Sequence, residues 1–315
     1  MKDFIFYEGL IPPDFVLDYE VSIFNLPEHR ALQSPYKWIS YYLLHKKSKT
    51  AFAEIHFHFS SGVASSPIKA SFGSIECSDE ISPLDLFRFL EMVEESIRLK
   101  GATKIEIKTP PQAYQTNLQN LLAVFLLNLG YTIISAETGA VRSVNSPFDS
   151  GLDNWEKRKL KQGHNVSFKL KQLDSSRLEE VYFFIESCRS KKGYILSMSL
   201  SELEQTNRAF PDRFLLMCVY RKNSIVAASI SILVRSNVLY NFYSDHDKSA
   251  DALSPVVLLM EGLYNYACAN KISLFDFGTS AIDGKPNFGL LDFKLRLGAD
   301  PTSKFTFEKI LNRDE

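Results

Sequence analysis

The chain contains one arrangement of sequence patterns twice, and this repeat constrains the fold more than any other feature. Residues 71–107 and 241–277 each read as a short strand, a polar loop, a helix that begins at Ser-Pro, and a short apolar strand. Serine at the N-cap and proline at the first helical position mark a helix start. Two strand–helix–strand units predict an α/β protein with two domains of one fold, and a chance likeness is the alternative that stays open.

The segments around the two units extend the likeness. Strands are predicted at 38–45, 51–59 and 68–74 before the first unit, and at 213–221, 225–234 and 238–244 before the second. A helix and a final strand follow each unit, at 115–129 and 131–144, and at 288–297 and 303–310. The second half adds a strand at 166–170 and helices at 177–190 and 201–209. Because residues 147–153 are rich in serine, aspartate and glycine, we predict domains at 1–150 and 151–315.

Composition and charge narrow the class of protein. Hydrophobic residues make up 45% and charged residues 23% of the 315 residues, as in soluble globular proteins. The formal net charge of -1 gives no reason to expect DNA as a partner and does not support tRNA. No signal peptide is recognised at the amino terminus, and the apolar run Leu121–Leu127 is too short for a membrane segment. The four cysteines show no close pairing, so we predict a reduced, cytoplasmic setting.

The most informative local feature lies near the end of the chain. Residues 274–280 read as a buried strand that stops at Gly278, and residues 287–299 read as a loop and a helix with Lys294 beside Phe293. A strand end that faces a helix with a cation is a common ligand site in α/β folds. This stretch resembles the last strand and helix of the FemABX-like branch of the GNAT acyltransferases.

The resemblance extends to the order of elements in residues 153–312, which is similar to the GNAT topology. It implies a mixed-sheet α/β fold with two tandem GNAT-like domains, of which the C-terminal one is catalytic. It also implies that Lys294 stabilises a developing negative charge, a sound role for a cation at a tetrahedral oxyanion. The alternative for Lys294 is an ordinary surface lysine on an amphipathic helix.

Asp276 and Tyr243 complete the predicted catalytic set. Asp276 alternates with two phenylalanines in an apolar strand, so it needs partners. It is expected either to orient a substrate amine or act as base, or simply to bond backbone at the end of the sheet. Backbone N–H groups near Tyr243 are expected to help to stabilise the oxyanion.

The loop 245–254 is the predicted donor site because it enters the amino terminus of a helix, where free N–H groups favour a pyrophosphate. The predicted donor contacts are Ser244, Leu253, Ser254 and Gly278. The glycine-rich arginine motif of ordinary GNAT enzymes is absent, since Ala250, Ala252 and Leu253 occupy that place. The FemABX-like branch also departs from that motif. A capped loop without any ligand is the alternative.

The predicted acceptor site combines two segments. Arg158 and Lys159 belong to a basic helix at 154–163, and a similar helix in FemABX-like proteins lies near the acceptor cleft. Ser280 and Asn287 flank the loop before the Lys294 helix. The basic helix is equally well explained as a solvated charged surface. His56 and His58 share one face of a strand, but no third ligand is suitably spaced, so no metal is predicted.

These features together predict an enzyme that moves an acyl or aminoacyl group from a thioester or ester donor to a small-molecule or peptide amine. Acyl-CoA or aminoacyl-tRNA is the expected donor, and cell-wall or envelope metabolism is the expected setting. Direct attack by an oriented amine needs no covalent enzyme intermediate, which agrees with the lack of a nucleophile motif. The alternative function is a non-catalytic GNAT-fold protein that binds a peptide or a nucleotide sugar.

Overall fold

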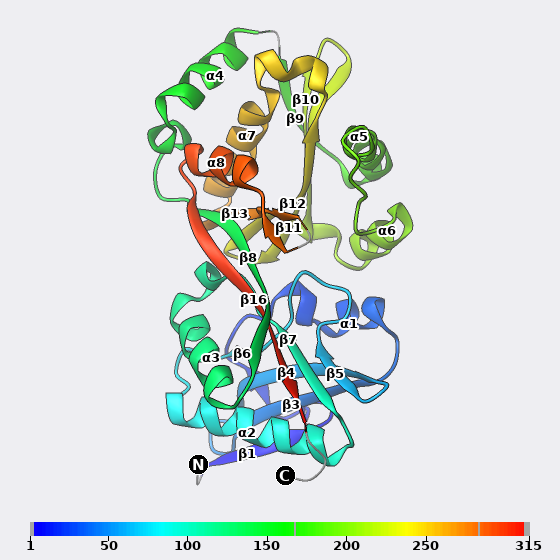
Figure 1. Ribbon diagram of the computed structural model, residues 1–315, viewed down its shortest axis with the longest axis vertical. Helices are drawn as coiled ribbons and strands as arrows, with labels where there is room; N and C mark the ends of the chain where they lie inside the picture. The colour runs from blue at the N-terminus through cyan, green and yellow to red at the C-terminus, as the bar shows by residue number, and fades with distance from the viewer. Residues whose placement is uncertain (1–2, 167, 283, 312–315) are drawn as a thin grey trace. The chain divides into compact units, whose positions relative to one another are not determined.

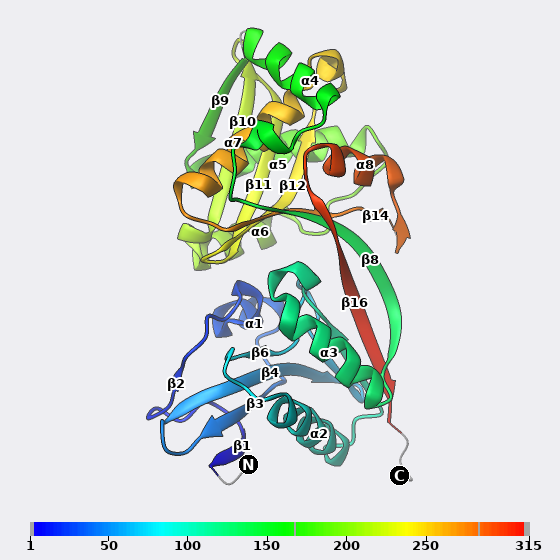
Figure 2. The ribbon, with the colours of Figure 1, turned by 90° about the vertical axis from the view of Figure 1, so that its left-hand side faces the viewer.

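The computed structural model describes residues 3–166, 168–282 and 284–311, and it divides into two compact units. Unit 1 consists of residues 1–137 together with 303–315, and unit 2 consists of residues 138–302. Each unit has a mixed α/β architecture with helices packed on a sheet (Figures 1 and 2). The α/β class with a mixed sheet is therefore confirmed.

Unit 1 contains a sheet whose strands follow the order β1-β3-β4-β5-β7-β16. Its strands are β1 (Phe4–Glu8), β2 (Val16–Leu17), β3 (Trp38–His45), β4 (Thr50–Ser60), β5 (Val63–Ser66), β6 (Glu76–Cys77), β7 (Lys104–Lys108) and most of β16 (Asp300–Ile310). Its helices are η1 (Ile23–Asn25), α1 (Pro27–Gln33), α2 (Pro83–Leu99), η2 (Gln112–Tyr114) and α3 (Thr116–Asn128). The apolar faces of α2 and α3 pack against the sheet and form its main core with Tyr41, Phe57 and Phe307.

Unit 2 contains the strand order β8-β13-β12-β11-β10-β9. Its strands are β8 (Thr132–Ser143), β9 (Phe168–Leu173), β10 (Phe214–Arg221), β11 (Ser224–Arg235), β12 (Val238–His246) and β13 (Leu274–Thr279), with a hairpin of β14 (Ala281–Ile282) and β15 (Lys285–Pro286). Its helices are η3 (Phe148–Gly151), α4 (Asn154–Asn165), η4 (Ser175–Arg177), α5 (Leu178–Ser190), α6 (Leu200–Ala209), η5 (Pro211–Arg213), η6 (Lys248–Leu253), α7 (Pro255–Ala269) and α8 (Phe288–Arg296).

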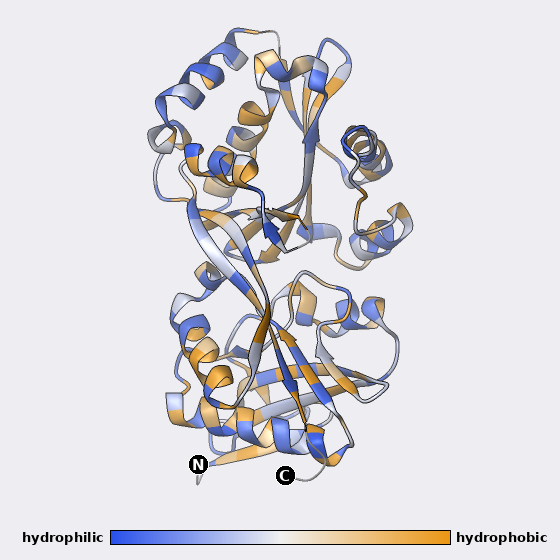
Figure 3. Cartoon of the chain, viewed as in Figure 1, coloured by the Kyte–Doolittle hydropathy of each residue, from blue (hydrophilic) through white to orange (hydrophobic). Residues whose placement is uncertain are grey.

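The two faces of the unit 2 sheet have separate cores. Helix α7, which is apolar along most of its length (Figure 3), packs on one face. Gly262 lets α7 approach closely, because a Cβ there would lie 2.4 Å from Leu170 and 2.6 Å from the sulfur of Met217. Helix α5 packs on the opposite face around Val181 and Ile185. This arrangement leaves the ends of β12 and β13 next to α7 and α8.

The last strands of the two halves are exchanged. Residues 139–143 of β8 pair with β13, whereas residues 306–310 of β16 pair with β7. The sequence analysis placed each strand in its own half, with a boundary near residue 150. The structure instead divides the chain at 137/138 and 302/303. Strand pairing over this distance in the chain leaves no local sequence signal, because each strand shows the same alternation with either partner.

One predicted strand is wrong. Residues 68–74 form no strand, and the chain makes β5 five to eight residues earlier. Ser61 and Gly62 both have positive φ, which gives the tight turn of a hairpin between β4 and β5. Pro67 then ends β5, since proline has no N–H to donate to a neighbouring strand.

Arg142 on β8 ties three segments of unit 2 together. Its Nη1 donates to the carbonyl oxygens of Phe148 and Leu297, each at 2.9 Å, and its Nη2 donates to that of Pro147 at 3.1 Å. The guanidinium is buried and lies over the rings of Phe148 and Tyr264. Because Leu297 caps α8, this contact anchors the helix that carries Lys294.

We expect Arg142→Met to lower the free energy of unfolding by about 2–4 kcal/mol, because buried carbonyls would lose charged donors. Urea denaturation followed by circular dichroism measures this change. Arg88→Met, on the exposed side of α2, is the matched control and should change stability by no more than about 0.5 kcal/mol. Equal losses in the two variants would contradict an anchoring role for Arg142.

Candidate functional site

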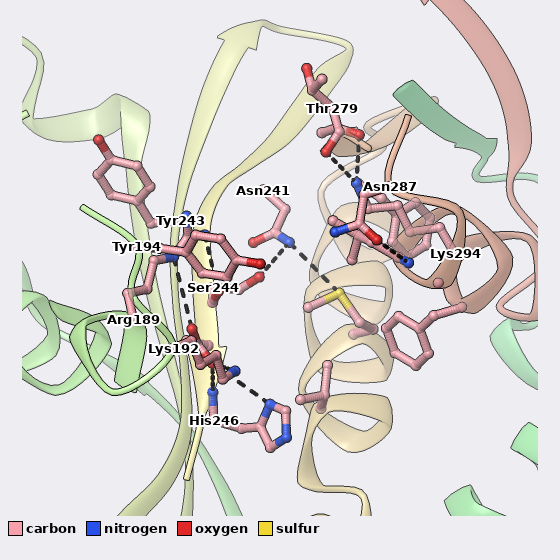
Figure 4. A pocket seen from close by; sticks show the side chains of 18 of the residues that line it. Arg189, Lys192, Tyr194, Asn241, Tyr243, Ser244, His246, Thr279, Asn287 and Lys294 are labelled. Carbon is pink, nitrogen blue, oxygen red and sulfur yellow. Dashed lines mark hydrogen bonds and ion pairs between the residues drawn. The ribbon is translucent and has the colours of Figure 1, made fainter. Parts of the chain in front are cut away.

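A pocket opens in unit 2 where β12 and β13 separate. The two strands run parallel and pair at Val238–Leu274, Leu239–Phe275 and Tyr240–Asp276, and their pairing ends there. Beyond that point β12 continues along β11 as far as His246, while β13 stays with β8. The pocket between them has a volume of about 740 Å³ and is lined by β12, β13, α5, α7 and α8 (Figure 4).

A β-bulge lies on the β12 wall of this pocket. Tyr243 pairs with Ile230 and Asn241 pairs with Ser231, so the register gives Phe242 no partner on β11. A bulged residue leaves the ladder of backbone hydrogen bonds. All three residues of β12 line the pocket, as the prediction of backbone groups near Tyr243 requires.

Lys294 lies at the β13 end of the pocket and is almost completely buried. Its Nζ donates to the carbonyl oxygen of Gly278 at 2.7 Å and to that of Thr279 at 2.9 Å. An ammonium group has three donors, so one remains for a group in the pocket. Burial lowers the pKa of Lys294 to about 8, against the opposing effect of the Asp276 carboxylate. Lys294 is therefore no ordinary surface lysine.

The start and end of α8 position this lysine. Asn287 is the N-cap, and its Oδ1 accepts from the backbone N–H of Leu290 at 3.1 Å. Gly298 follows the helix with φ +79°, and a Cβ there would lie 2.5 Å from the carbonyl oxygen of Gly151. Asn287 also lines the pocket, so capping does not remove it from the predicted acceptor site.

Asp276 has a backbone partner. Its carboxylate accepts from the N–H of Gly278 at 2.6 Å, and its side chain is buried and does not line the pocket. Gly278 has φ +80°, and a Cβ there would lie 3.3 Å from the ring of Tyr240. Asp276 thus shapes the turn that presents the two carbonyls to Lys294. This geometry corresponds to the backbone-bonding alternative for Asp276, and a role as base stays a prediction.

Tyr243 lines the pocket with its hydroxyl group already occupied. The hydroxyl accepts from the backbone N–H of Met198 at 3.0 Å and lies 2.6 Å from Oγ of Ser197. Burial raises the pKa of the Tyr243 phenol above its ordinary value. The guanidinium of Arg189 lies over its ring. Tyr243 therefore lines the pocket, and its hydroxyl group is bound to Ser197 and Met198. The predicted role of Tyr243 concerns the backbone N–H groups near it and does not use the phenol.

Three of the four predicted donor contacts line the pocket: Ser244, Ser254 and Gly278 do, and Leu253 does not. Ser254 occupies the N-cap position of α7 but has φ 46° and makes no capping hydrogen bond through its side chain. Val256 and Val257 of the first turn also line the pocket. The amino terminus of α7 therefore faces the pocket without a side-chain cap.

The predicted acceptor residues divide between the pocket and other places. Lys159 lines the pocket, whereas Arg158 lies outside it, stacked on Trp155 and bonded to the carbonyl oxygen of Asn154. Ser280 is fully buried and does not line the pocket. Its backbone N–H donates to the carbonyl oxygen of Thr138 at 2.7 Å.

The sequence analysis missed the charged wall opposite α7. Asp245 is nearly buried and lies 2.5 Å from Nζ of Lys192 and 3.8 Å from Nε of Arg189. Nε2 of His246 lies 2.6 Å from Oδ1 of Asp251, and all five residues line the pocket. The basic residues that end the helix at 177–190 were a signal for this wall, but only the fold brings them to the end of β12.

The described residues place limits on two other kinds of site. They contain no cluster of three or more histidine, cysteine, aspartate or glutamate side chains arranged to hold a metal ion. His56 instead pairs its Nδ1 with Oγ of Ser40 at 2.9 Å, and the ring of His58 lies against Trp38. None of the helices in the described ranges has the length and apolar character needed to cross a bilayer.

Comparison with known proteins gives one family match and several structural ones. Residues 156–294 match the family model described as an acetyltransferase (GNAT) domain. No curated protein sequence matches the chain. The crystal structure of FemX is similar with a TM-score of 0.68 at 12% identity, over 92% of this chain and 92% of FemX.

Two further structures share the fold. L-PGS from Bacillus licheniformis has a TM-score of 0.56 at 12% identity, over 90% of this chain and 86% of its own. A tandem GNAT protein from the clavulanic acid biosynthesis pathway has a TM-score of 0.50 at 10% identity, over 88% and 84%. At such identities the structural likeness establishes the fold. Residues 156–294 thus match an acetyltransferase (GNAT) domain, and the chain shares its fold with FemX and with a tandem GNAT protein.

Proposed function

We propose that the pocket of unit 2 transfers an acyl group from a thioester or ester donor to an amine. The observation that carries the proposal is the buried ammonium of Lys294, which has one donor left and lies where β12 and β13 separate. A fixed cation in a place with little water stabilises a developing oxyanion far better than one in solvent. A role in cell-wall or envelope metabolism, which the FemABX resemblance implies, is part of the proposal.

The amine nitrogen attacks the donor carbonyl carbon, and the negative charge that develops on oxygen is stabilised by Lys294. We propose the backbone at the Phe242 bulge as the source of a second N–H donor, because the register of β12 shifts against β11 there. Collapse of the tetrahedral intermediate breaks the bond to sulfur or oxygen and forms the amide. The amine proton leaves with the thiol or alcohol. The protein supplies position and charge, with no covalent enzyme intermediate.

The two units differ at the helix start that a donor phosphate would use. In unit 1, Oγ of Ser82 accepts from the N–H of Asp85 at 3.1 Å, and Asp85 adds negative charge to the first turn of α2. In unit 2, Ser254 leaves the start of α7 without such a cap. A phosphate is attracted to free N–H groups and repelled by a carboxylate. This difference supports unit 2 as the donor-binding and catalytic unit.

The charged wall suits an acceptor that carries an anionic group. Asp245 orients Lys192 and Arg189, and most of the donors on these two cations remain unused by the interactions described. Lys159 adds a third cation to the lining. Cations that a buried carboxylate holds in place can bind a carboxylate or phosphate with little loss of side-chain entropy.

Lys294→Met is expected to lower kcat/KM by at least about 100-fold, as removal of an oxyanion donor does in other enzymes. Transfer from acyl thioesters to a panel of amines, followed by thiol release, measures the rate. Lys161→Met, an exposed lysine on α4, should retain the wild-type rate. Unfolding midpoints of both variants show whether the fold is intact. A folded Lys294→Met protein with the wild-type rate would show that catalysis does not use this cation. Absence of turnover in the wild type and in both variants would favour a binding function.

The rate should fall on the alkaline side with an apparent pKa of about 8, because the Lys294 ammonium loses its charge there. Folding should respond in the opposite sense. The pKa of this lysine is lower in the folded chain than in the unfolded chain, so its burial costs most below pH 8, and this cost disappears as pH rises toward 10.5. A neutral amine still has two N–H donors for the two carbonyls.

The measurement compares the wild type with Lys294→Met across this pH range. Their difference in unfolding free energy should increase in favour of the wild type as pH rises from 8, while the wild-type rate falls. A rate that stays level above pH 9, or a difference that shrinks, would contradict this assignment of Lys294.

A further inference from the structure

The lining of the pocket is divided by chemical character. Arg189, Lys192, Tyr194 and His246 lie together on the side of α5 and β12, as Figure 4 shows. The side of α7 is formed by Val256, Val257 and Met260. The end that contains Lys294 combines the polar residues Thr279 and Asn287 with the apolar residues Ile282, Leu290 and Phe293. A substrate that fills this pocket can therefore place charged groups toward α5 and the uncapped start of α7, and apolar groups toward Met260, Leu290 and Phe293.

Apolar side chains continue past Lys294 to the surface. Ile282 of the β14–β15 hairpin and Leu290 of α8 line the pocket, yet they are 40% and 38% exposed. Phe293 lies deeper in the lining, and Phe288 at the first turn of α8 is 69% exposed. Exposed aliphatic and aromatic side chains gathered at the mouth of a pocket mark a place where an apolar group is bound. We call Ile282, Leu290 and Phe293 the apolar rim.

In the described part of the chain, the carboxylates that line the pocket lie away from this rim. Among the described residues that line it, only Asp245 and Asp251 carry a carboxylate, and both belong to the β12 and η6 side. Asp245 is paired with Lys192, and Asp251 with His246. The α-ammonium of an aminoacyl group would lie beside the ammonium of Lys294 and against the apolar side chains of the rim. Both contacts are unfavourable for a positive charge in a site with little water.

We propose that the transferred group is an apolar acyl chain of several carbons without an α-amino group, and that this chain lies on the apolar rim. The inference rests on the proposed acyl transfer at Lys294 and adds the class of acyl group. The step is the one given above: the carbon–sulfur or carbon–oxygen bond of the donor breaks, and a carbon–nitrogen bond to the amine forms. The chain itself takes no part in the bond changes and supplies binding energy.

A matched pair of donors tests the charge argument. Leucyl and 4-methylpentanoyl thioesters of N-acetylcysteamine share one carbon skeleton and differ only by the α-amino group. Calorimetric titration at about pH 6, where this amino group is protonated, measures their dissociation constants. We expect the leucyl thioester to bind at least about tenfold more weakly. Equal or tighter binding of the leucyl thioester would overturn the proposal in favour of an aminoacyl group.

A chain-length series tests the apolar rim. The dissociation constant should fall about three- to fourfold for each methylene added between the acetyl and octanoyl thioesters, until the rim is filled. Ile282→Ser and Leu290→Ser should each weaken this dependence on length. Leu99→Ser, at an exposed site on α2 in unit 1, is the control and should leave it unchanged.

The outcomes separate this inference from the proposed function. Binding that does not improve with chain length, together with measurable transfer from the acetyl thioester, would overturn the apolar-chain proposal and leave acyl transfer intact. A chain-length dependence that the two rim variants retain in full would place the chain elsewhere and also overturn it. Length-dependent binding without transfer to any amine would support the rim and count against the proposed function.

Discussion

The contact between the Lys294 ammonium and the carbonyls of Gly278 and Thr279 is the interaction on which the site depends. It joins the end of β13 to α8 at the point where β12 and β13 separate. The contact therefore helps to form the pocket and also places a positive charge in it. The turn at Gly278, held by Asp276, presents both carbonyls to one nitrogen atom. A buried cation is costly without such partners. The same hydrogen bonds that make this burial tolerable leave one N–H for chemistry.

Many helices and strands were predictable because their signals are local. The period of apolar residues and the Ser-Pro starts predicted α2 and α7, whereas Lys294 was singled out mainly by the resemblance of the Phe-Lys helix to FemABX-like proteins. Three outcomes were beyond such signals. The partners of β8 and β16 depend on pairing across the chain, the φ of Ser254 depends on how η6 packs, and Arg189 and Lys192 reach the pocket only through the position of α5.

The two units share one strand–helix–strand plan but differ in how that plan ends at the helix start. Ser82 closes the amino terminus of α2, while Ser254 at the corresponding place leaves α7 open. A serine followed by proline thus has two outcomes, depending on whether its backbone is extended or left-handed. The two Ser-Pro sequences look alike, yet only the start of α7 has N–H groups without a side-chain cap, which a phosphate could bind. Duplicated domains can diverge in this way while their cores change little.

The exchange of β8 and β16 has a consequence for how the protein is made. Strand β16 follows the whole of unit 2 in the chain, yet it supplies the neighbour of β7 in unit 1. During translation, the amino-terminal residues must therefore wait, with one sheet edge unpaired, until some two hundred further residues have left the ribosome. The pairing of β8 in unit 2 has no such delay, because β8 is synthesised before the other strands of that unit. Synthesis from the amino terminus thus lets the sheet of unit 2 be completed before that of unit 1.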